Sequence, residues 1–88
     1  MKTIKEVMNM NVGEVLGLSV RSCNSLRRVN IEKLSELTAM SKDNLFNNGI
    51  KTIDEIDSKL AEIGLCWQMA DRDWANWGTS HIEWIKAH

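Results

Sequence analysis

The stretch Leu18-Ser19-Val20-Arg21-Ser22-Cys23-Asn24-Ser25-Leu26-Arg27-Arg28 carries three arginines and no acidic residue. The whole protein has a formal net charge of −1, so subtracting these three positive charges leaves −4 on the other residues. This stretch is therefore a local basic surface on a mildly acidic protein.

A helix is expected directly after Ser19. The Ser19 hydroxyl can accept a hydrogen bond from the free backbone N–H groups at the start of a helix. Polar side chains then recur at the spacing of one helix face, at Arg21, Asn24, Ser25 and Arg28. Apolar Val20, Cys23 and Leu26 point in another direction. One side of this helix can thus pack on a core while the other contacts a partner.

The stretch Asn47-Asn48-Gly49-Ile50-Lys51-Thr52-Ile53-Asp54-Glu55-Ile56 predicts a tight turn at Gly49 followed by a second helix. Thr52 and Glu55 have the spacing of a capping box at the start of that helix. A helix N-terminus preceded by glycine offers unpaired N–H groups and a positive dipole end to a phosphate, and Lys51 stands beside it.

With both stretches, the protein resembles the C-terminal domain of the bacterial RNA polymerase alpha subunit from Val12 to Leu65. The resemblance implies a compact all-α bundle of short helices, related to helix-hairpin-helix folds. It also implies binding to the minor groove of A/T-rich double-stranded DNA and contacts with transcription activators and sigma factor. In that family the arginine inserted into the groove falls on Arg21. The DNA-contacting positions that the resemblance implies are Arg21, Asn24, Ser25, Arg27, Gly49, Lys51, Thr52 and Glu55.

The sequence departs from the family pattern in three places. The segment before Gly49 is about three residues shorter than the usual loop, and Ile50 stands where a basic residue is common. The residues after Leu65 match nothing in the family. No amino-terminal assembly domain of the alpha subunit is present, so we expect a stand-alone protein of a phage or other mobile element, acting in the bacterial cytoplasm.

Length and composition favour one soluble all-α domain spanning residues 1–88. The 88 residues include no proline and show no strand-like alternation. We divide them into an alpha-C-terminal-domain-like core at 12–65 and a Trp-rich helical extension at 66–88. The stripe Ile53, Ile56, Leu60 and Ile63, ended by Gly64, predicts the central helix of the core. Residues 10–18, which contain two glycines, predict a bent connection.

The extension contains all four tryptophans of the protein within eighteen residues. The spacing of Trp67, Trp74 and Trp77 predicts a helix from about 66 to 76 that ends at Gly78, and Ser80 with Glu83 predicts a capping box for a last helix carrying Trp84. Two interpretations stay open. The extension either folds back and packs on the core, or uses Trp67, Trp74, Trp77 and Trp84 to dock a partner, because tryptophan is enriched at interface hot spots.

Nothing in the sequence indicates an enzyme. There is no arrangement typical of nucleophilic catalysis, and the glycine turn lacks the preceding strand and first glycine of a nucleotide-binding loop. The two cysteines and two histidines have no metal-ligand spacing, and every long apolar run is interrupted by polar residues. We expect no metal, no cofactor, no small-molecule substrate and no membrane association.

Two functions follow from these features. The first is a transcription-related DNA-binding module that contacts the minor groove of A/T-rich DNA through Arg21 and the Gly49–Lys51 hairpin. The alternative is a phage or mobile-element interaction protein, which uses this fold and its Trp-rich extension to bind and modulate a host complex. That complex could be RNA polymerase, a transcription activator or a defence nuclease.

Overall fold

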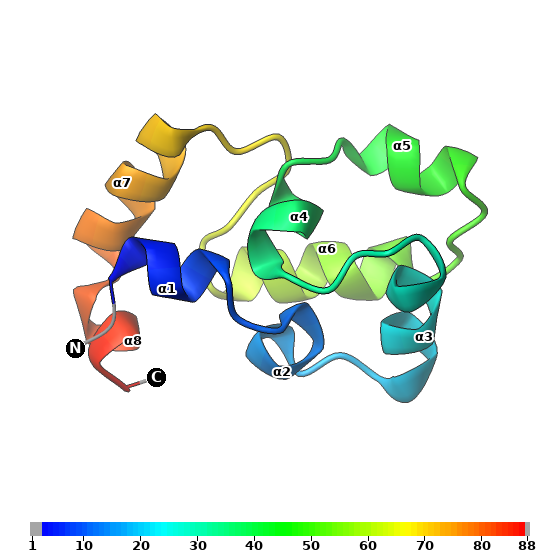
Figure 1. The fold of residues 1–88 in the computed structure, drawn as a ribbon, viewed down its shortest axis with the longest axis horizontal. Helices are drawn as coiled ribbons and strands as arrows, with labels where there is room; N and C mark the ends of the chain where they lie inside the picture. Colours follow the sequence, from blue (N-terminus) through cyan, green and yellow to red (C-terminus); the bar gives the residue numbers. More distant parts are fainter. Residues whose placement is uncertain (1–2, 88) are drawn as a thin grey trace.

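The computed structural model describes residues 3–87, and these fold into eight short α-helices without a β-strand (Figure 1). The helices are α1 (Ile4–Met8), α2 (Val12–Leu16), α3 (Val20–Arg28), α4 (Leu34–Thr38), α5 (Lys42–Asn47), α6 (Ile53–Glu62), α7 (Asp71–Ser80) and α8 (Ile82–Ala87). The all-α fold expected from the sequence is confirmed. In Figure 1, α3 and α5 lie at one end of the molecule and α7 and α8 at the other, with α6 running between them.

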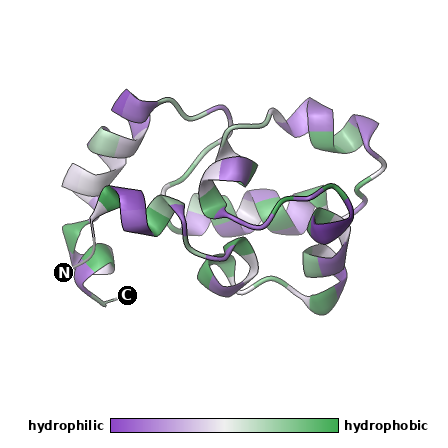
Figure 2. Cartoon of the chain, in the orientation of Figure 1, coloured by the Kyte–Doolittle hydropathy of each residue, from purple (hydrophilic) through white to green (hydrophobic). Residues whose placement is uncertain are grey.

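Helix α6 supplies the centre of the core, as its apolar stripe predicts. Ile53, Ile56 and Leu60 are buried, and α6 packs against both α2 and α5. Burial of one such aliphatic group is worth roughly 1.5–3 kcal/mol. The helix ends at Glu62, and the backbone turns away two residues later at Gly64, whose φ of 76° lies in the left-handed region that glycine adopts without a Cβ penalty. Figure 2 shows hydrophobic and hydrophilic residues side by side on α3 and α6, the pattern of helices with one buried face.

The predicted bent connection at residues 10–18 is wrong, because Val12–Leu16 forms helix α2. Asn11 caps this helix, since its side-chain oxygen accepts from the Glu14 backbone N–H at 3.1 Å. Val12 and Leu16 then reach the core, while Gly17 ends the helix with a φ of 64°. A β-bridge between Asn11 and Lys33 ties the start of α2 to the start of α4. The two glycines suggested a loop, but the cap and the two buried positions outweigh them.

The predicted helix at 66–76 is also wrong, because α7 begins only at Asp71. Before it, Gln68 has a φ of 55°, which no helix tolerates. The backbone N–H of Gln68 donates to Met40 O at 3.2 Å, and that of Met69 donates to Thr38 O at 2.8 Å. These bonds to the end of α4 hold residues 65–70 in an irregular connection, and α7 extends through Gly78 to Ser80. Ser80 is therefore the last residue of α7 and not the cap of α8.

The extension packs back onto the rest of the protein, as the first interpretation of the tryptophans proposes. Trp74 and Trp77 are 2% and 4% exposed and belong to the same buried cluster as Val7 and Leu60. The Trp77 indole N–H donates to Ile63 O at 2.7 Å, which fixes α7 to the end of α6. This continuous core supports our proposal that residues 1–88 form a single domain.

Within residues 3–87, no helix is long and apolar enough to cross a lipid bilayer.

Candidate nucleic-acid interface

Helix α3 forms as its sequence predicts. The Ser19 hydroxyl caps it by accepting from the Ser22 backbone N–H at 3.3 Å. Ser22 and Leu26 are fully or almost fully buried, so this side of the helix packs on the core. Arg21, Asn24 and Arg28 lie on the other side of the helix, and all three are exposed. The polar face predicted from the spacing is thus available to a partner.

The turn before α6 is built around Gly49, whose φ is 77°. The Gly49 N–H donates to Phe46 O at 3.0 Å, and the Ile50 N–H donates to Leu45 O at 3.2 Å, so the turn continues directly from α5. Ile50 is buried and anchors the turn in the core, whereas Lys51 is exposed. An apolar residue at position 50 therefore contributes to packing and leaves Lys51 as the cation of this turn.

Helix α3 and the glycine turn together line one concave surface of about 310 Å³, which we call the basic groove. Its lining residues are Arg21, Asn24, Ser25, Arg28, Gly49 and Lys51. Three of these six are cations and none is acidic. Two stretches that are more than twenty residues apart in sequence thus meet at one site, as the DNA-binding hypothesis requires. Arg28, which the resemblance did not include among the contacts, joins them.

Glu55 does not form the predicted capping box with Thr52. Thr52 makes no side-chain capping bond, and its buried hydroxyl has no hydrogen-bond partner within the described part of the protein. The Glu55 carboxylate instead accepts from the Ser19 N–H at 2.8 Å, the Ser19 hydroxyl at 3.0 Å and the Ser22 hydroxyl at 2.7 Å. Glu55 therefore joins α6 to the start of α3.

These bonds affect the charge state of Glu55. The backbone N–H of Ser19, followed by the Ser22 hydroxyl, holds the pKa of the Glu55 carboxyl below its ordinary value of 4.5. A carboxylate that accepts several hydrogen bonds is stabilised in its ionised form. Glu55 consequently stays negative at neutral pH and positions α3, while its oxygen atoms are already occupied by protein donors.

Two other predicted contact residues have different surroundings. The Ser25 hydroxyl donates to Arg21 O at 3.0 Å, so it bonds back to its own helix. Arg27 lies outside the basic groove and lines a separate small hollow with Asn11, Cys23 and Glu32. The structure therefore brings Arg21, Asn24, Ser25, Gly49 and Lys51 together at the basic groove, but not Arg27.

The tryptophans predicted to dock a partner divide into two pairs. Trp74 and Trp77 are buried and leave little ring surface for another protein. Trp67 and Trp84 are half-buried. The Trp67 indole N–H donates to Asp57 at 3.0 Å, and Lys42 lies 3.2 Å from the other carboxylate oxygen. The hydrogen bond from the Trp67 indole, and after it the one from Lys42, holds the pKa of Asp57 below its ordinary value of 3.8.

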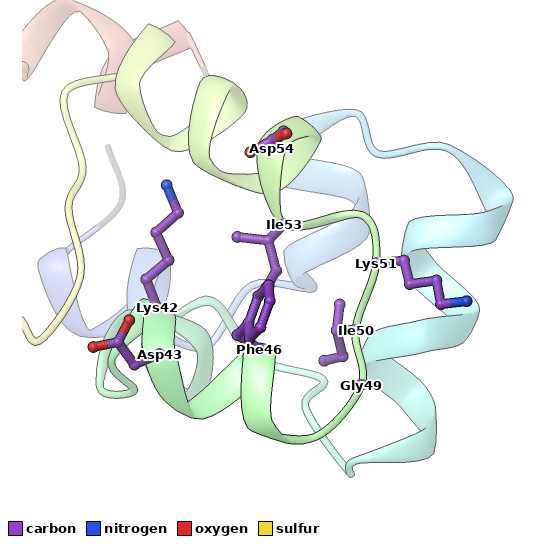
Figure 3. Close-up of a pocket in the computed structure, with 8 residues that line it drawn as sticks. All are labelled: Lys42, Asp43, Phe46, Gly49, Ile50, Lys51, Ile53 and Asp54. Carbon is purple, nitrogen blue, oxygen red and sulfur yellow. The ribbon is translucent and has the colours of Figure 1, made fainter.

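Beside the basic groove lies a second hollow of about 420 Å³, which sequence reasoning missed (Figure 3). Phe46 of α5 is 75% exposed and lines it together with Ile50 and Ile53. In Figure 3 the Lys51 side chain points away from Phe46, and Asp54 lies at the start of α6. The charged residues of this hollow are two acids, Asp43 and Asp54, and two lysines, Lys42 and Lys51, so the hollow is apolar and of mixed charge where the basic groove is polar and cationic. The apolar residue next to the turn was the only signal in the sequence.

Among residues 3–87, no group of three or more His, Cys, Asp or Glu side chains could hold a metal ion.

The fold and the basic groove define a small all-helical binding domain with a surface suited to anions. Residues 1–62 match the family model of the C-terminal domain of the bacterial RNA polymerase alpha subunit. Because the match covers well over half of the sequence, the protein belongs to this family, as the resemblance at Arg21 and Gly49 predicted. This membership agrees with the expectation that the protein is not an enzyme.

Curated relatives support the same assignment. The protein is 41% identical over 70 residues to the DNA-directed RNA polymerase subunit alpha of Clostridium botulinum, which covers 76% of this chain and 22% of the relative. It is 39% identical over 69 residues to that of Desulfitobacterium hafniense, covering 75% of this chain and 22% of the relative. With the subunit of Clavibacter michiganensis the identity is 49% over 55 residues, covering 59% of this chain and 17% of the relative.

The protein thus spans about a fifth of the length of these relatives. No solved structure matches it.

Proposed function

We propose that this protein is a transcription-related DNA-binding module that contacts the minor groove of A/T-rich DNA. The observation that supports it most is the basic groove, in which α3 and the glycine turn present Arg21, Asn24, Arg28 and Lys51 on one concave surface. Membership of the RNA polymerase alpha C-terminal domain family supports it independently.

The physical case rests on the shape and potential of DNA. The narrow minor groove of A/T-rich DNA has an enhanced negative potential that attracts an inserted arginine. The planar guanidinium of Arg21 can donate several hydrogen bonds to base edges there, and the amide of Asn24, one turn along α3, lies on the same face. Lys51 and Arg28, which line the same groove, would contact phosphates, and such contacts fix the orientation without reading sequence.

Three cations predict weak, salt-sensitive binding. Each neutralised phosphate contributes about −0.9 to the slope of log affinity against log salt concentration. A module with so few contacts works best when it is tethered to a larger assembly or bound in more than one copy. The names of its relatives make RNA polymerase the first assembly to consider, with sigma factor or an activator as further partners and the bacterial cytoplasm as the place of action.

The proposal is tested by fluorescence anisotropy of labelled A/T-rich and G/C-rich duplexes titrated with the protein at low and moderate salt. We expect preference for the A/T-rich duplex and a loss of affinity of about 5- to 150-fold in Arg21→Ala, since a good base contact is worth about 1–3 kcal/mol. Arg72→Ala is the matched control, because Arg72 is an exposed cation of α7, which lies at the other end of the molecule (Figure 1). Equal loss in both variants, or none in either, would contradict the proposal.

A further inference from the structure

The second hollow, between the end of α5 and the start of α6, leaves an aromatic ring open to solvent (Figure 3). We call it the Phe46 hollow. Phe46 is 75% exposed, whereas Ile50 and Ile53, which also line the hollow, are buried. Helix α5 ends at Asn47, and Asn48 alone separates it from Gly49, so this connection is too short to cover the Phe46 ring. The ring and the apolar lining are therefore available to a ligand.

The two lysines that line the Phe46 hollow do not neutralise it. Lys42 is engaged elsewhere, because its Nζ lies 3.2 Å from Asp57 Oδ2. Lys51 lines the basic groove as well, and in Figure 3 its side chain points away from Phe46. The charge presented to a ligand of this hollow therefore comes from its acidic residues.

These acidic residues are Asp43 of α5 and Asp54 of α6, and both are exposed. Neither carboxylate has an ion-pair or hydrogen-bond partner within the part of the protein that the structure describes. Two free carboxylates repel a phosphate and attract a cation. The Phe46 hollow is thus suited to a ligand with an apolar body and a positively charged end, and not to DNA.

We propose that the Phe46 hollow binds an arginine side chain of a partner protein. A guanidinium is planar and weakly hydrated, so it stacks on an aromatic face better than an ammonium does. Its aliphatic stem packs over the apolar lining at Ile50 and Ile53, as the stems of long cationic side chains do on apolar surface. The charge then lies close to the carboxylates of Asp43 and Asp54. Arginine is also enriched among the residues that dominate protein interfaces.

This site goes beyond the proposed DNA binding and does not rest on it. The Phe46 hollow and the basic groove share Gly49 and Lys51, but they offer opposite charges to a ligand. The arginine of a partner and a DNA phosphate therefore bind on different sides of the glycine turn. Because an exposed ion pair contributes little, a single arginine gives a weak site, and a partner needs further contacts to bind tightly.

An NMR titration of the isotope-labelled 88-residue protein tests the proposal. The probes are two blocked pentapeptides of the same sequence, one with a central arginine and the other with citrulline, its uncharged isostere. Phe46 is the only phenylalanine of the protein, so its ring resonances report contact at the hollow directly. We expect the arginine peptide to shift these resonances and the amide signals of Ile50 and Ile53. The citrulline peptide should bind at least about twofold more weakly, because it lacks the charge.

Two variants and their matched controls locate the site. Phe46→Ala should weaken binding of the arginine peptide about two- to fivefold, the loss expected for an exposed cation–π contact, and Val20→Ala should not. Val20 is 77% exposed and lies outside the hollow. Asp54→Asn should weaken binding too, whereas Asp71→Asn should not. Like Asp54, Asp71 is an exposed acid in the first turn of a helix, but it does not line the hollow.

Equal affinity for the two peptides would overturn the proposal. So would unchanged Phe46 ring resonances in the presence of the arginine peptide, or an equal loss in Asp54→Asn and Asp71→Asn. Anisotropy with the A/T-rich duplex separates this site from the basic groove, because Phe46→Ala should bind DNA as the wild type does. A loss of DNA affinity in Phe46→Ala would contradict a separate site, whereas failure of the wild type to bind DNA would bear only on the basic groove.

Discussion

Replacement of Gly64 by alanine measures how firmly the extension is fixed to the family core. Gly64 follows the end of α6 by two residues and has a φ of 76°, and a Cβ at this position would lie 2.5 Å from Nε2 and 2.6 Å from Cε1 of His81. His81 follows α7 and stacks on Trp77 at a centroid distance of 5.0 Å. Its Nδ1 also lies 2.9 Å from Trp77 O, a carbonyl to which it can donate. Gly64→Ala therefore forces the ring away from both interactions.

The cost has a backbone part and a contact part. A left-handed conformation costs a residue with a Cβ about 1–2 kcal/mol. Displacement of His81 forfeits an aromatic stack worth about 0.5–1.5 kcal/mol and a hydrogen bond of about the same value. Gly17 also has a positive φ, of 64°, but a Cβ there would meet nothing within 4 Å. Gly17→Ala should therefore cost only the backbone part, and Gly64→Ala about 1–3 kcal/mol more.

Urea denaturation followed by tryptophan fluorescence gives both free energies of unfolding. For a domain of this size each kcal/mol corresponds to about 4–8 °C in the melting temperature, so thermal unfolding is a second measurement. In a His81→Ala background, Gly64→Ala should cost no more than Gly17→Ala does, because the clash has been removed. Equal costs of Gly17→Ala and Gly64→Ala in the wild-type background would refute the packing of the extension on the end of α6.

Three further outcomes are expected. Glu55→Gln should stay folded and lower DNA affinity by less than Arg21→Ala does, because it loosens the start of α3 without removing a contact in the basic groove. Fluorescence anisotropy compares the two variants, and an equal or larger loss of affinity in Glu55→Gln would indicate that Glu55 contacts DNA directly. Lys51→Ala should weaken binding to all duplexes alike and reduce the salt slope by about 1, which a salt titration measures. The pKa values of Glu55 and Asp57 are lowered in the folded state, so the stability that these carboxylates confer is present above their ordinary pKa values of 4.5 and 3.8 and is lost as the pH falls below those values. Thermal melts across the acid range should therefore show a smaller loss of stability on acidification for Asp57→Asn than for the wild type, and an unchanged profile would contradict the role of Asp57.

Features governed by neighbouring residues could be predicted from the sequence. The Ser19 cap, the polar face of α3 and the turn at Gly49 each depend on a few adjacent side chains, and the structure contains all three. The stripe on α6 is equally local, because it repeats at helical spacing. The same residues carry the family resemblance, so the sequence predicts both parts of the basic groove.

Features governed by distant contacts could not be predicted. Glu55 has the spacing of a capping box with Thr52, but Ser19 and Ser22 provide three better donors from another part of the sequence. The sequence places the start of this helix at about residue 66, whereas α7 begins at Asp71, because Gln68 adopts a positive φ and the connection before α7 bonds to the end of α4.

The tryptophan spacing was misleading for the same reason. Trp67 belongs to the connection and bonds to Asp57, whereas Trp74 and Trp77 belong to α7 and the core. The helical spacing of Trp67, Trp74 and Trp77 therefore suggests one common helix face, although these side chains have different roles in the structure.

The measurement that tests minor-groove recognition most directly compares three duplexes of equal length, composed of A·T, G·C or inosine·C pairs. Inosine·C presents the major-groove pattern of G·C but lacks the guanine amino group, so its minor groove resembles that of A·T. We predict that the wild-type protein binds the A·T and inosine·C duplexes with similar affinity, binds G·C more weakly, and loses this preference in Arg21→Ala. Binding in which inosine·C behaves like G·C would contradict insertion of Arg21 into the minor groove.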